Sequence, residues 1–567
     1  MIILGVSFYY HDSAAAIIKD GQIIAAAQEE RFTRKKHDNR FPYHAINYCL
    51  DSLGIAINEV DYIAFYEKPI VKFERILVQH ITHFPKSAKV FFDTIPSWLL
   101  EKLRVKDIFK NELHYHGEFM FIPHHLSHAA ASYLTSPFQE AAVFTLDGVG
   151  EWATTTLGYA KGNQITLEKQ INFPHSLGLF YSAMTAYLGF AVNNDEYKVM
   201  GLSAYGKSEP LYDKIRKLIK TNPDGSFELD TQYFSYEYQE KMFNQKLCDY
   251  LGAPARIMDG PMTPHYENVA AATQKVFEDV LFYSLNILHQ KHPSNNLVLS
   301  GGSALNSLAN GKISSRTPFK NFYITPDPGD GGGSLGAALY AYFCVLNKKA
   351  THSLLASAYL GPGFTRSEMK ATIDKYKLKA TLISESDKLI DKVSGLLVDQ
   401  KVIGWFQGRM EWGPRALGNR SILAAATSHE MQDTINAKVK HREMFRPFAP
   451  VILREKTHEY FETDKNISVS ADYMLLVYPF KKSVQSKVPA VVHVDGSGRL
   501  QTIDEQSNSL YYRLIKAYSK KTGIHLILNT SFNVKGEPIV CTPEDAIKCF
   551  LHTEIDYLVL GNYLIKK

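Results

Sequence analysis

Two stretches of this chain, about 140 residues apart, repeat one order of elements: an apolar strand, an acidic loop and a hairpin. Apolar residues bounded by turn signals predict each strand. The expected strands are residues 2–6, 13–18 and 23–27 in the first stretch and 142–146, 154–160 and 165–171 in the second. The repeat favours a duplicated α/β fold with a cleft between its halves. The alternative is that the hairpins are unrelated, because hairpins are common in α/β proteins.

The length of 567 residues is more than one hydrophobic core organises, so we expect at least two domains. The pattern of predicted elements changes after about residue 346, and residues 347–364 are typical of a linker. We therefore predict one domain over residues 1–350 and a second over residues 351–567. The hydrophobic content of 45% is ordinary for a globular chain.

Two glycine-rich turns lie near the end of the first predicted domain. A helix is expected from Pro264 to about residue 289, followed by a strand over residues 296–300. Glycines before a helix let a phosphate or a ribose approach free backbone N–H groups. The residues predicted to hold a nucleotide in this way are Gly148, Gly301, Gly302, Asn306 and Gly331. Glycine turns are also common packing devices, so the turns alone do not decide between the two interpretations.

A pair of histidines, His124 and His128, is spaced by one helical turn and lies on one face of a predicted helix. Asp147 is the third candidate ligand and Asp330 the fourth. Two imidazoles with carboxylates suit a divalent transition metal, with Fe²⁺ as the leading candidate and Zn²⁺ or Mn²⁺ as alternatives. His125 falls between the two aligned positions, and we expect it to brace the helix.

A dense group of arginines and lysines marks the second predicted domain, and it lies among glycines and aromatic residues. Guanidinium groups at this density are typical of a site for small phosphates and carboxylates. The candidate residues are Arg415, Arg420, Ser421, Lys438, Lys440, Arg442, Arg446, Asn529, Ser531 and Asn533. A solvated charged face is the alternative, but the neighbouring Trp412 and Phe448 argue against it.

The overall composition argues against several classes of protein. The net charge of +5 is too small for a nucleic-acid binder of this size, and no apolar run approaches the ~20 residues of a membrane span. The five cysteines form no CxxC pair, which favours a reducing, cytoplasmic location. We expect no nucleic-acid or membrane partner, and a homodimer stays open.

Motifs along the whole chain resemble those of the O-carbamoyltransferases of antibiotic and nodulation-factor biosynthesis. Each motif is weak alone, and the combination is specific. The motifs are Gly5-x-Ser7 with Tyr10-His11-Asp12-Ser13, Glu29-Glu30-Arg31, His124-x-x-x-His128, Asp147-Gly148, Gly301-Gly302-x-x-x-Asn306, Gly329-Asp330, Arg409 through Ser421, Arg446-Pro447-Phe448-Ala449-Pro450 and Asn529-Thr530-Ser531-Phe532-Asn533.

The resemblance implies a duplicated ribonuclease H-like domain of the actin/hexokinase superfamily, similar to the universal tRNA threonylcarbamoyl-transfer protein. It implies a C-terminal α+β domain with a YrdC-like fold. In such proteins the C-terminal domain uses carbamoyl phosphate and ATP, with Mg²⁺, to make carbamoyl-adenylate. The N-terminal domain then transfers the carbamoyl group to a hydroxyl of a small-molecule acceptor. The resemblance also places the metal at His124, His128, Asp147 and Asp330.

His11 is the candidate general base for the acceptor hydroxyl, because the ordinary pKa of histidine, about 6.5, suits that role. Asp12 is expected to orient His11 or to bind the acceptor. Residues 68–110 and 227–263 are expected to shape the acceptor pocket. The alternatives are a small-molecule kinase of the same superfamily, a nucleotide-sensing protein without catalysis, and a protein that modifies tRNA.

Overall fold

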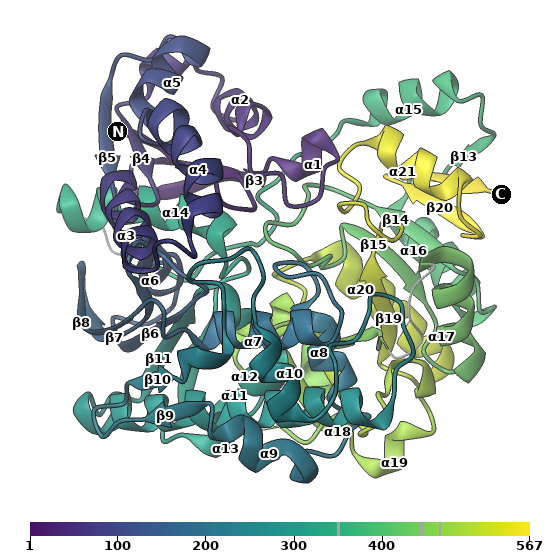
Figure 1. The fold of residues 1–567 in the computed structure, drawn as a ribbon. Coiled ribbons are helices and arrows are strands. Elements are labelled where there is room, and N and C mark those ends of the chain that lie inside the picture. Colours follow the sequence, from purple (N-terminus) through teal and green to yellow (C-terminus); the bar gives the residue numbers. More distant parts are fainter. Residues whose placement is uncertain (349–351, 441–445, 464–465) are drawn as a thin grey trace. The chain divides into compact units, whose positions relative to one another are not determined.

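The computed structural model describes residues 1–348, 352–440, 446–463 and 466–567 (Figure 1). Within these residues the chain divides into two compact units. Unit 1 comprises Met1–Ile24, Asn39–Asn306 and Lys312–Leu354. Unit 2 comprises Ala25–Asp38, Ser307–Gly311 and Leu355–Lys567.

Two five-stranded sheets form the framework of the first half of the described chain. The first has the order β3-β2-β1-β4-β5 and the second the order β8-β7-β6-β11-β12. In the first sheet β1 is antiparallel to β2 and parallel to β4, and β4 is parallel to β5. In the second sheet β6 is antiparallel to β7 and parallel to β11, and β11 is parallel to β12. The strands are β1 (Ile2–Ser7), β2 (Ala14–Lys19), β3 (Gln22–Gln28), β4 (Tyr62–Phe65), β5 (Glu118–Phe121), β6 (Glu140–Leu146), β7 (Ala153–Lys161), β8 (Gln164–Asn172), β11 (Asn296–Ser300) and β12 (Asn321–Tyr323).

The predicted duplication is confirmed, because both sheets share one strand order. The pairs β1/β2, β1/β4 and β4/β5 also have the same directions as β6/β7, β6/β11 and β11/β12. A short third sheet pairs β9 (Ile219–Thr221) with β10 (Phe227–Leu229). The helices of unit 1 are α2 (Tyr43–Asp51), α3 (Pro69–Thr82), α4 (Ala88–Ser97), α5 (Val105–Leu113), α6 (His124–Tyr133), α7 (Leu177–Tyr187), α8 (Glu196–Leu202), α9 (Glu209–Arg216), α10 (Gln245–Leu251), α11 (Pro264–Lys291), α13 (Ile313–Arg316) and α14 (Asp330–Tyr340).

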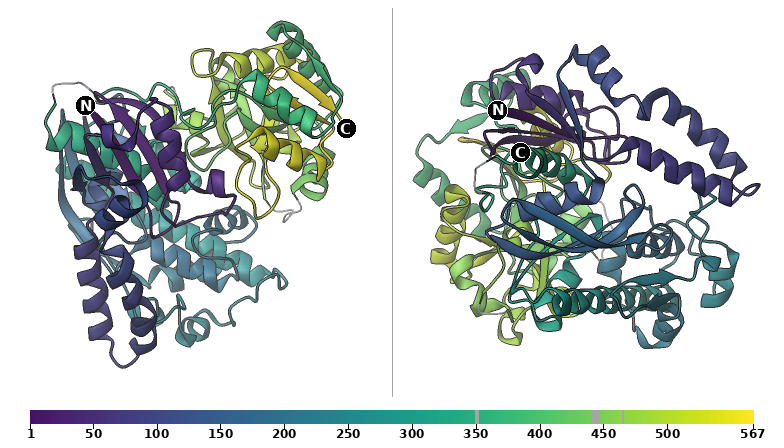
Figure 2. Two further views of the ribbon diagram at one scale, coloured as in Figure 1. Left: turned by 90° about the horizontal axis from the view of Figure 1, so that it is seen from above. Right: turned by 90° about the vertical axis from the view of Figure 1, so that its left-hand side faces the viewer.

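Helices α6 and α14 connect the two sheets of unit 1. Helix α14 packs on β1, β2 and β4, whereas α6 packs on β6 and β11 and also against α14. A Cβ atom on Gly336 would lie 1.9 Å from the carbonyl oxygen of Ser127, so the two helix backbones are in direct contact. Figure 2 shows α11 running along the second sheet, and α3 and α4 extending away from the first. The first residues of α6 and α14, His124 and Asp330, therefore lie close together.

The expectation that the glycine-rich turns precede helices is partly wrong. Gly301 and Gly302 lead into a 3₁₀ turn over Gly302–Leu305 instead of an α-helix. At the second turn the helix begins before the glycines, at Asp330. The glycines after Asp330 are therefore helical, and their small size serves packing: a Cβ on Gly332 would lie 1.9 Å from the carbonyl oxygen of Asp327.

Unit 2 is built on a mixed sheet with the order β13-β21-β20-β14-β15-β19-β16-β18-β17 among the described residues. Its strands are β13 (Ala380–Leu382), β14 (Ile403–Phe406), β15 (Arg420–Ala424), β16 (Ala449–Leu453), β17 (Leu476–Pro479), β18 (Ser497–Ile503), β19 (Leu526–Ser531), β20 (Tyr557–Leu560) and β21 (Tyr563–Lys566). Its helices are α1 (Glu30–Thr33), α12 (Ser307–Asn310), α15 (Arg366–Lys375), α16 (Ser386–Val398), α17 (His429–Ile435), α18 (Thr457–Tyr460), α19 (Lys482–Gln485), α20 (Ser509–Thr522) and α21 (Pro543–Leu551).

The core of unit 2 lies between the sheet and the paired helices α16 and α20. Trp405 of β14 is fully buried there, in one hydrophobic cluster with Val393 of α16 and Ile515 of α20. Burying such side chains contributes about 1.5–3 kcal/mol each. The sheet and its helices thus form a unit with a hydrophobic core of its own.

Residues 25–38 belong to unit 2 although they come early in the chain. Within unit 2, the guanidinium of Arg31 donates to the carbonyl oxygen of Gly413 (2.9 Å), and that of Arg34 donates to the carbonyl oxygens of Pro538 and Ile539 (2.8 and 2.6 Å). A division of the sequence at residue 350 does not anticipate this arrangement, because these contacts join residues about 380 to 505 positions apart.

All five cysteines lie among the described residues, and all are free thiols. None of the helices in the described part of the chain has the length and apolar character that crossing a membrane requires.

We predict that Gly336→Ala lowers the stability of the protein by about 1–3 kcal/mol, because the added methyl group forces α14 away from α6. Gly395 in α16 is the matched control, since a Cβ there would meet only Nζ of Lys521, at 3.7 Å. Gly395→Ala should leave stability unchanged or raise it by up to about 1 kcal/mol. The melting temperatures of both variants test this, and an unaltered Gly336→Ala protein would contradict the close-packing argument.

Candidate metal centre

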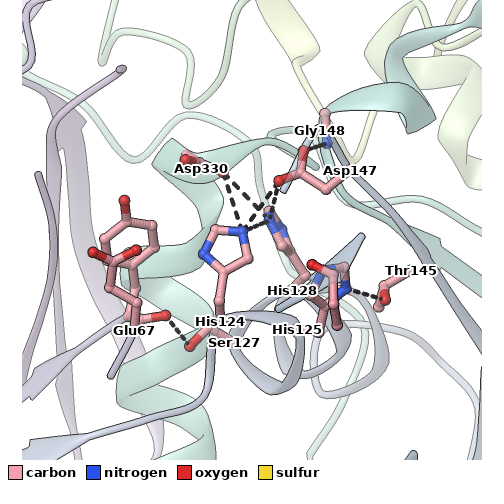
Figure 3. A network of polar contacts seen from close by, with 12 residues as sticks. Glu67, His124, His125, Ser127, His128, Thr145, Asp147, Gly148 and Asp330 are labelled. Atoms are coloured by element: carbon pink, nitrogen blue, oxygen red, sulfur yellow. Dashed lines mark hydrogen bonds and ion pairs between the residues drawn. The ribbon is translucent and has the colours of Figure 1, made fainter. Parts of the chain in front are cut away.

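Four side chains meet where α6 and α14 begin and β6 ends (Figure 3). Helix α6 begins at His124, directly after Pro123. His128 therefore lies one turn further along the helix, on the same face. Asp147 directly follows β6, and Asp330 is the first residue of α14. The structure therefore brings together all four predicted metal ligands, from three separate parts of the sequence.

The geometry of the quartet is tight. Nε2 of His124 lies 3.1 Å from Oδ2 of Asp147 and 3.6 Å from Oδ1 of Asp330. Nε2 of His128 lies 3.8 and 3.4 Å from the same two oxygens. One potential ligand atom from each residue lies within 4.8 Å of all the others. None of the four residues is more than 5% exposed.

The polar atoms of the quartet are those that a cation would satisfy. Nε2 of His124 and Nε2 of His128 face each other at 3.0 Å, an arrangement in which both nitrogens can offer lone pairs to one centre. Both carboxylate oxygens of Asp330 are buried without a hydrogen-bond donor among the described residues. Buried charges in proteins are paired or coordinate a metal. Two imidazoles and two carboxylates therefore fit a divalent transition metal.

Electrostatics at the quartet lead to the same conclusion. Burial would raise the pKa of Asp147, but the hydrogen bonds from His124 and His128 hold it well below its usual range. Burial disfavours a charged imidazole, but the two aspartates raise the pKa of His128 to about 10. Two buried carboxylates thus require positive charge beside them, either as protons on the imidazoles or as a cation.

His125 points away from the quartet (Figure 3). Its Nδ1 lies 2.6 Å from Oγ1 of Thr145, and its Nε2 donates to the carbonyl oxygen of Ala153 at 2.8 Å. Burial lowers the pKa of His125 to about 3, so the ring is neutral and can accept at Nδ1. These contacts tie α6 to β6 and β7, which is the bracing role expected for this residue.

Glu151 supports the quartet, and the sequence analysis did not single it out. Its carboxylate accepts hydrogen bonds from the backbone N–H of His124 (2.9 Å) and of Lys68 (2.8 Å), at the starts of α6 and α3. A carboxylate at a helix N-terminus satisfies free N–H groups and complements the helix dipole. The available signal was its place in the acidic, glycine-rich loop that begins at Asp147.

The candidate base His11 lies in the loop after β1 and is partly buried. Its Nδ1 is 2.9 Å from Oδ2 of Asp12, the neighbour expected to orient it. Burial alone would lower the pKa of His11, but the hydrogen bond to Asp12 and the charge of Asp330 raise it to about 9. The carboxylates of Asp12, Asp330 and Asp147 therefore all favour a protonated His11.

The predicted nucleotide residues lie around the end of β6. Gly301 has φ +97°, and a Cβ there would lie 2.2 Å from the carbonyl oxygen of Leu146. The N–H of Gly302 donates to Oδ1 of Asp147 at 2.9 Å, so this amide orients a candidate metal ligand. The side chain of Asn306 pairs with that of Gln274.

The two remaining nucleotide candidates also have structural partners. The carbonyl oxygen of Gly148 accepts a hydrogen bond from Oγ of Ser176 at 2.7 Å. Gly331 lies in the first turn of α14, where its carbonyl oxygen accepts from Oγ of Ser334 at 2.7 Å. These contacts hold the backbone that surrounds Asp147 and Asp330.

Part of the predicted basic site in unit 2 forms a connected cluster. Nζ of Lys440 donates to the carbonyl oxygen of Ser531 and to Oδ1 of Asn533 (2.8 Å). Oγ of Ser531 donates to the same Oδ1 at 2.7 Å. Ser421 on β15 is the antiparallel partner of Ser531 on β19, so these residues meet at one end of the two strands.

Arg420 has a different environment from the one expected. It is completely buried, and its guanidinium donates to backbone carbonyl oxygens, including those of Asn419 and Pro362 (2.9 and 3.0 Å). Its charge also lies 3.7 Å from the ring centre of Phe406. These contacts shape the loop that carries Arg415, which is itself partly exposed.

The other predicted residues of unit 2 are placed as follows. The side-chain amide of Asn529 donates to Oε1 of Gln501 at 2.7 Å, and Arg446 is partly exposed. Arg442 and the side chain of Lys438 lie outside the described residues.

Comparison with known proteins finds matches over most of the chain. The family model "Carbamoyltransferase N-terminus" matches residues 2–339, and "Carbamoyltransferase C-terminus" matches residues 394–567. "Uncharacterized protein sll1178" of Synechocystis is 45% identical, with 100% of this chain and 96% of that protein aligned. "Nodulation protein NolNO" of Sinorhizobium fredii is 35% identical, with 99% and 79% aligned.

Among solved structures, HypF of T. kodakarensis matches with 13% identity and a TM-score of 0.31, over 61% of this chain and 48% of that one. A match of this kind carries no argument about this chain. Its family is shown by the two family models and by the relatives aligned over most of their length.

We predict that Glu151→Ala weakens binding of a divalent metal about 10–100-fold, the usual effect of removing a group that orients a ligand. Glu140→Ala is the control. Glu140 is the first residue of β6, the strand that ends just before Asp147, and it is exposed. Metal titration of the apoprotein with Fe²⁺ or Mn²⁺ gives both affinities. Equal affinity in the Glu151→Ala protein and the wild type would show that this carboxylate is not needed to place His124.

Proposed function

Because the chain belongs to the carbamoyltransferase family, we propose that it is an ATP-dependent O-carbamoyltransferase that forms carbamoyl-adenylate and then modifies a small-molecule hydroxyl. The observation that carries the proposal is the buried quartet of two imidazoles and two carboxylates in unit 1. A second, basic cluster in unit 2 supports a separate step there. The actin/hexokinase-superfamily and YrdC-like folds are part of this proposal.

In the first step, unit 2 makes the activated carbamoyl group. Water hydrolyses carbamoyl phosphate to carbamate and inorganic phosphate, a carbamate oxygen then bonds to the α-phosphorus of ATP, and pyrophosphate leaves. Lys440, Arg415 and Arg446 offset the phosphate charges, while Ser531 and Asn533 hold Lys440 in place. Mg²⁺ accompanies the ATP.

In the second step, unit 1 transfers the carbamoyl group. The acceptor hydroxyl bonds to the carbamoyl carbon, AMP leaves, and the hydroxyl proton passes to His11. Asp12 holds His11 at Nδ1, which leaves Nε2 to receive the proton. A divalent cation at His124, His128, Asp147 and Asp330 would supply charge that neutralises the adenylate phosphate and polarises the carbamoyl group.

The overall proposal is tested with the purified chain, ATP, Mg²⁺, carbamoyl phosphate and Fe²⁺. We expect pyrophosphate, phosphate and a carbamoyl-adenylate that decays to AMP when no acceptor is present. Liquid chromatography with mass spectrometry detects all of these products. ADP with a phosphorylated hydroxyl compound would instead indicate a kinase, and the absence of any turnover would indicate a nucleotide-binding protein without catalysis.

The two steps should be separable by mutation. His124→Ala should lose metal and lower the transfer rate more than about 100-fold, while adenylate formation persists. Removing a group that only orients a metal ligand already lowers metal affinity or activity about 10–100-fold. Lys440→Met should keep the metal but lower pyrophosphate release, and with it the carbamoylated product that depends on the adenylate. Lys392→Met, on the exposed face of α16, is its control. Pyrophosphate release and carbamoylated product are measured separately. Loss of both activities in His124→Ala would argue against two sites.

A further inference from the structure

The two segments expected to shape the acceptor pocket lie together in unit 1. Nε2 of His83, after α3, lies 3.2 Å from Oε2 of Glu237, and the ring of His83 stacks on Tyr238. The side-chain amide of Gln79 in α3 donates to the carbonyl oxygen of Glu237 at 2.7 Å. Helix α3 and the segment around residue 237 therefore pack against each other and form one continuous wall of unit 1.

Two cations on the buried face of α3 differ in how they are paired. Nζ of Lys72 lies 2.6 Å from Oε2 of Glu67 and is neutralised by it. Arg75, one turn later, is 6% exposed. Within the described part of the chain, Arg75 forms no ion pair, its Nη1 donates to Oε1 of Gln79 (3.1 Å), and its Nε has no acceptor.

An arginine in this environment is costly for the fold. A buried charge loses its hydration, and a nearby counter-ion is the usual compensation. Arg75 has the hydrogen bond to Gln79, the ring of Phe173 and the more distant charges of Glu67 and Glu151, which compensate only in part. Burial lowers the pKa of Arg75 to about 10, which still leaves the guanidinium charged at neutral pH. Buried charged groups with unused hydrogen-bond donors are typical of binding sites, where the ligand supplies the missing partner.

The surroundings of Arg75 lead back to the metal quartet. Its guanidinium lies over the ring of Phe173, 5.0 Å from the centre. The N–H of Phe173 donates to the carbonyl oxygen of Trp152, the residue after Glu151, which binds the N–H of His124. On the other side, Lys72 lies over the ring of Tyr10, next to His11. Arg75 is thus part of the same region of unit 1 as the candidate base and ligands.

We propose that Arg75 binds an oxyanion, a carboxylate or a phosphate, carried by the acceptor. The proposal rests on the transferase function above and narrows the acceptor to a hydroxyl compound that also bears a negative charge. A guanidinium matches such a group with two parallel hydrogen bonds, and Nε is one of the donors left for it. The rings of Phe173 and Tyr238 lie on the same wall and offer apolar contact to the rest of the molecule.

A first experiment separates a binding role from a structural one. Arg75→Met keeps the apolar contact with Phe173 and removes the unpaired charge, so the melting temperature of the protein without ligand should stay the same or rise. Arg104→Met, at an exposed arginine, is the control. A fall of more than about 5 °C in Arg75→Met alone would show that the fold needs this charge, and would overturn the proposal.

A second experiment measures the ligand preference of the full-length, metal-loaded protein by saturation-transfer NMR. The probes are matched acids and amides, namely glucuronate with glucuronamide and 4-hydroxybenzoate with 4-hydroxybenzamide, together with AMP. The wild type should favour the acids, Arg75→Gln should lose that preference with roughly tenfold to hundredfold weaker binding, and Arg75→Lys should keep part of it. AMP binding should not change.

Each other outcome of that experiment is also informative. No preference for acids in the wild type overturns the proposal, and weaker AMP binding in Arg75→Gln assigns the oxyanion to the nucleotide instead. The readout is binding rather than turnover. A protein that prefers acids but makes no carbamoyl-adenylate would therefore contradict the transferase function and not the role of Arg75.

Discussion

Helices α6 and α14 approach each other as closely as backbone allows, because Gly336 has no side chain to separate it from the carbonyl oxygen of Ser127. That contact sets the separation of the two helix starts, and with it the distances between His124 or His128 and Asp330. Each helix rests on a different sheet, so the contact also joins the two copies of the duplicated fold. The chemistry of unit 1 therefore depends on a packing constraint.

The position of the quartet has an electrostatic cost that the neighbouring groups reduce. Asp147 receives a backbone N–H from Gly302, and Glu151 satisfies the start of α6, so several donors and acceptors are fixed before any ligand arrives. Asp330 is left without such a donor among the described residues. The charge at this position is thus the part that a cation would compensate. Arg75 is the opposite case, a buried cation that forms no ion pair within the described residues.

Much of unit 1 could be predicted from the sequence, because strands and a helical pair of histidines depend on local spacing. The four candidate ligands come from motifs whose residue types suit a metal, and the structure brings them together. Glu151 and Arg75 could not be predicted in this way, since their roles depend on the partners they have or lack in three dimensions. The membership of residues 25–38 in unit 2 likewise depends on contacts with residues hundreds of positions away.

The same two aspartates link the metal centre to the candidate base. Burial alone would lower the pKa of His11, but its hydrogen bond with Asp12 and the charges of Asp330 and Asp147 raise it to about 9. A histidine that already holds its proton cannot accept another. A divalent cation at the quartet would offset the part of this shift that comes from Asp330 and Asp147, and not the part that comes from Asp12. The proposed base therefore depends both on the charge at the quartet and on its own neighbour in the loop after β1.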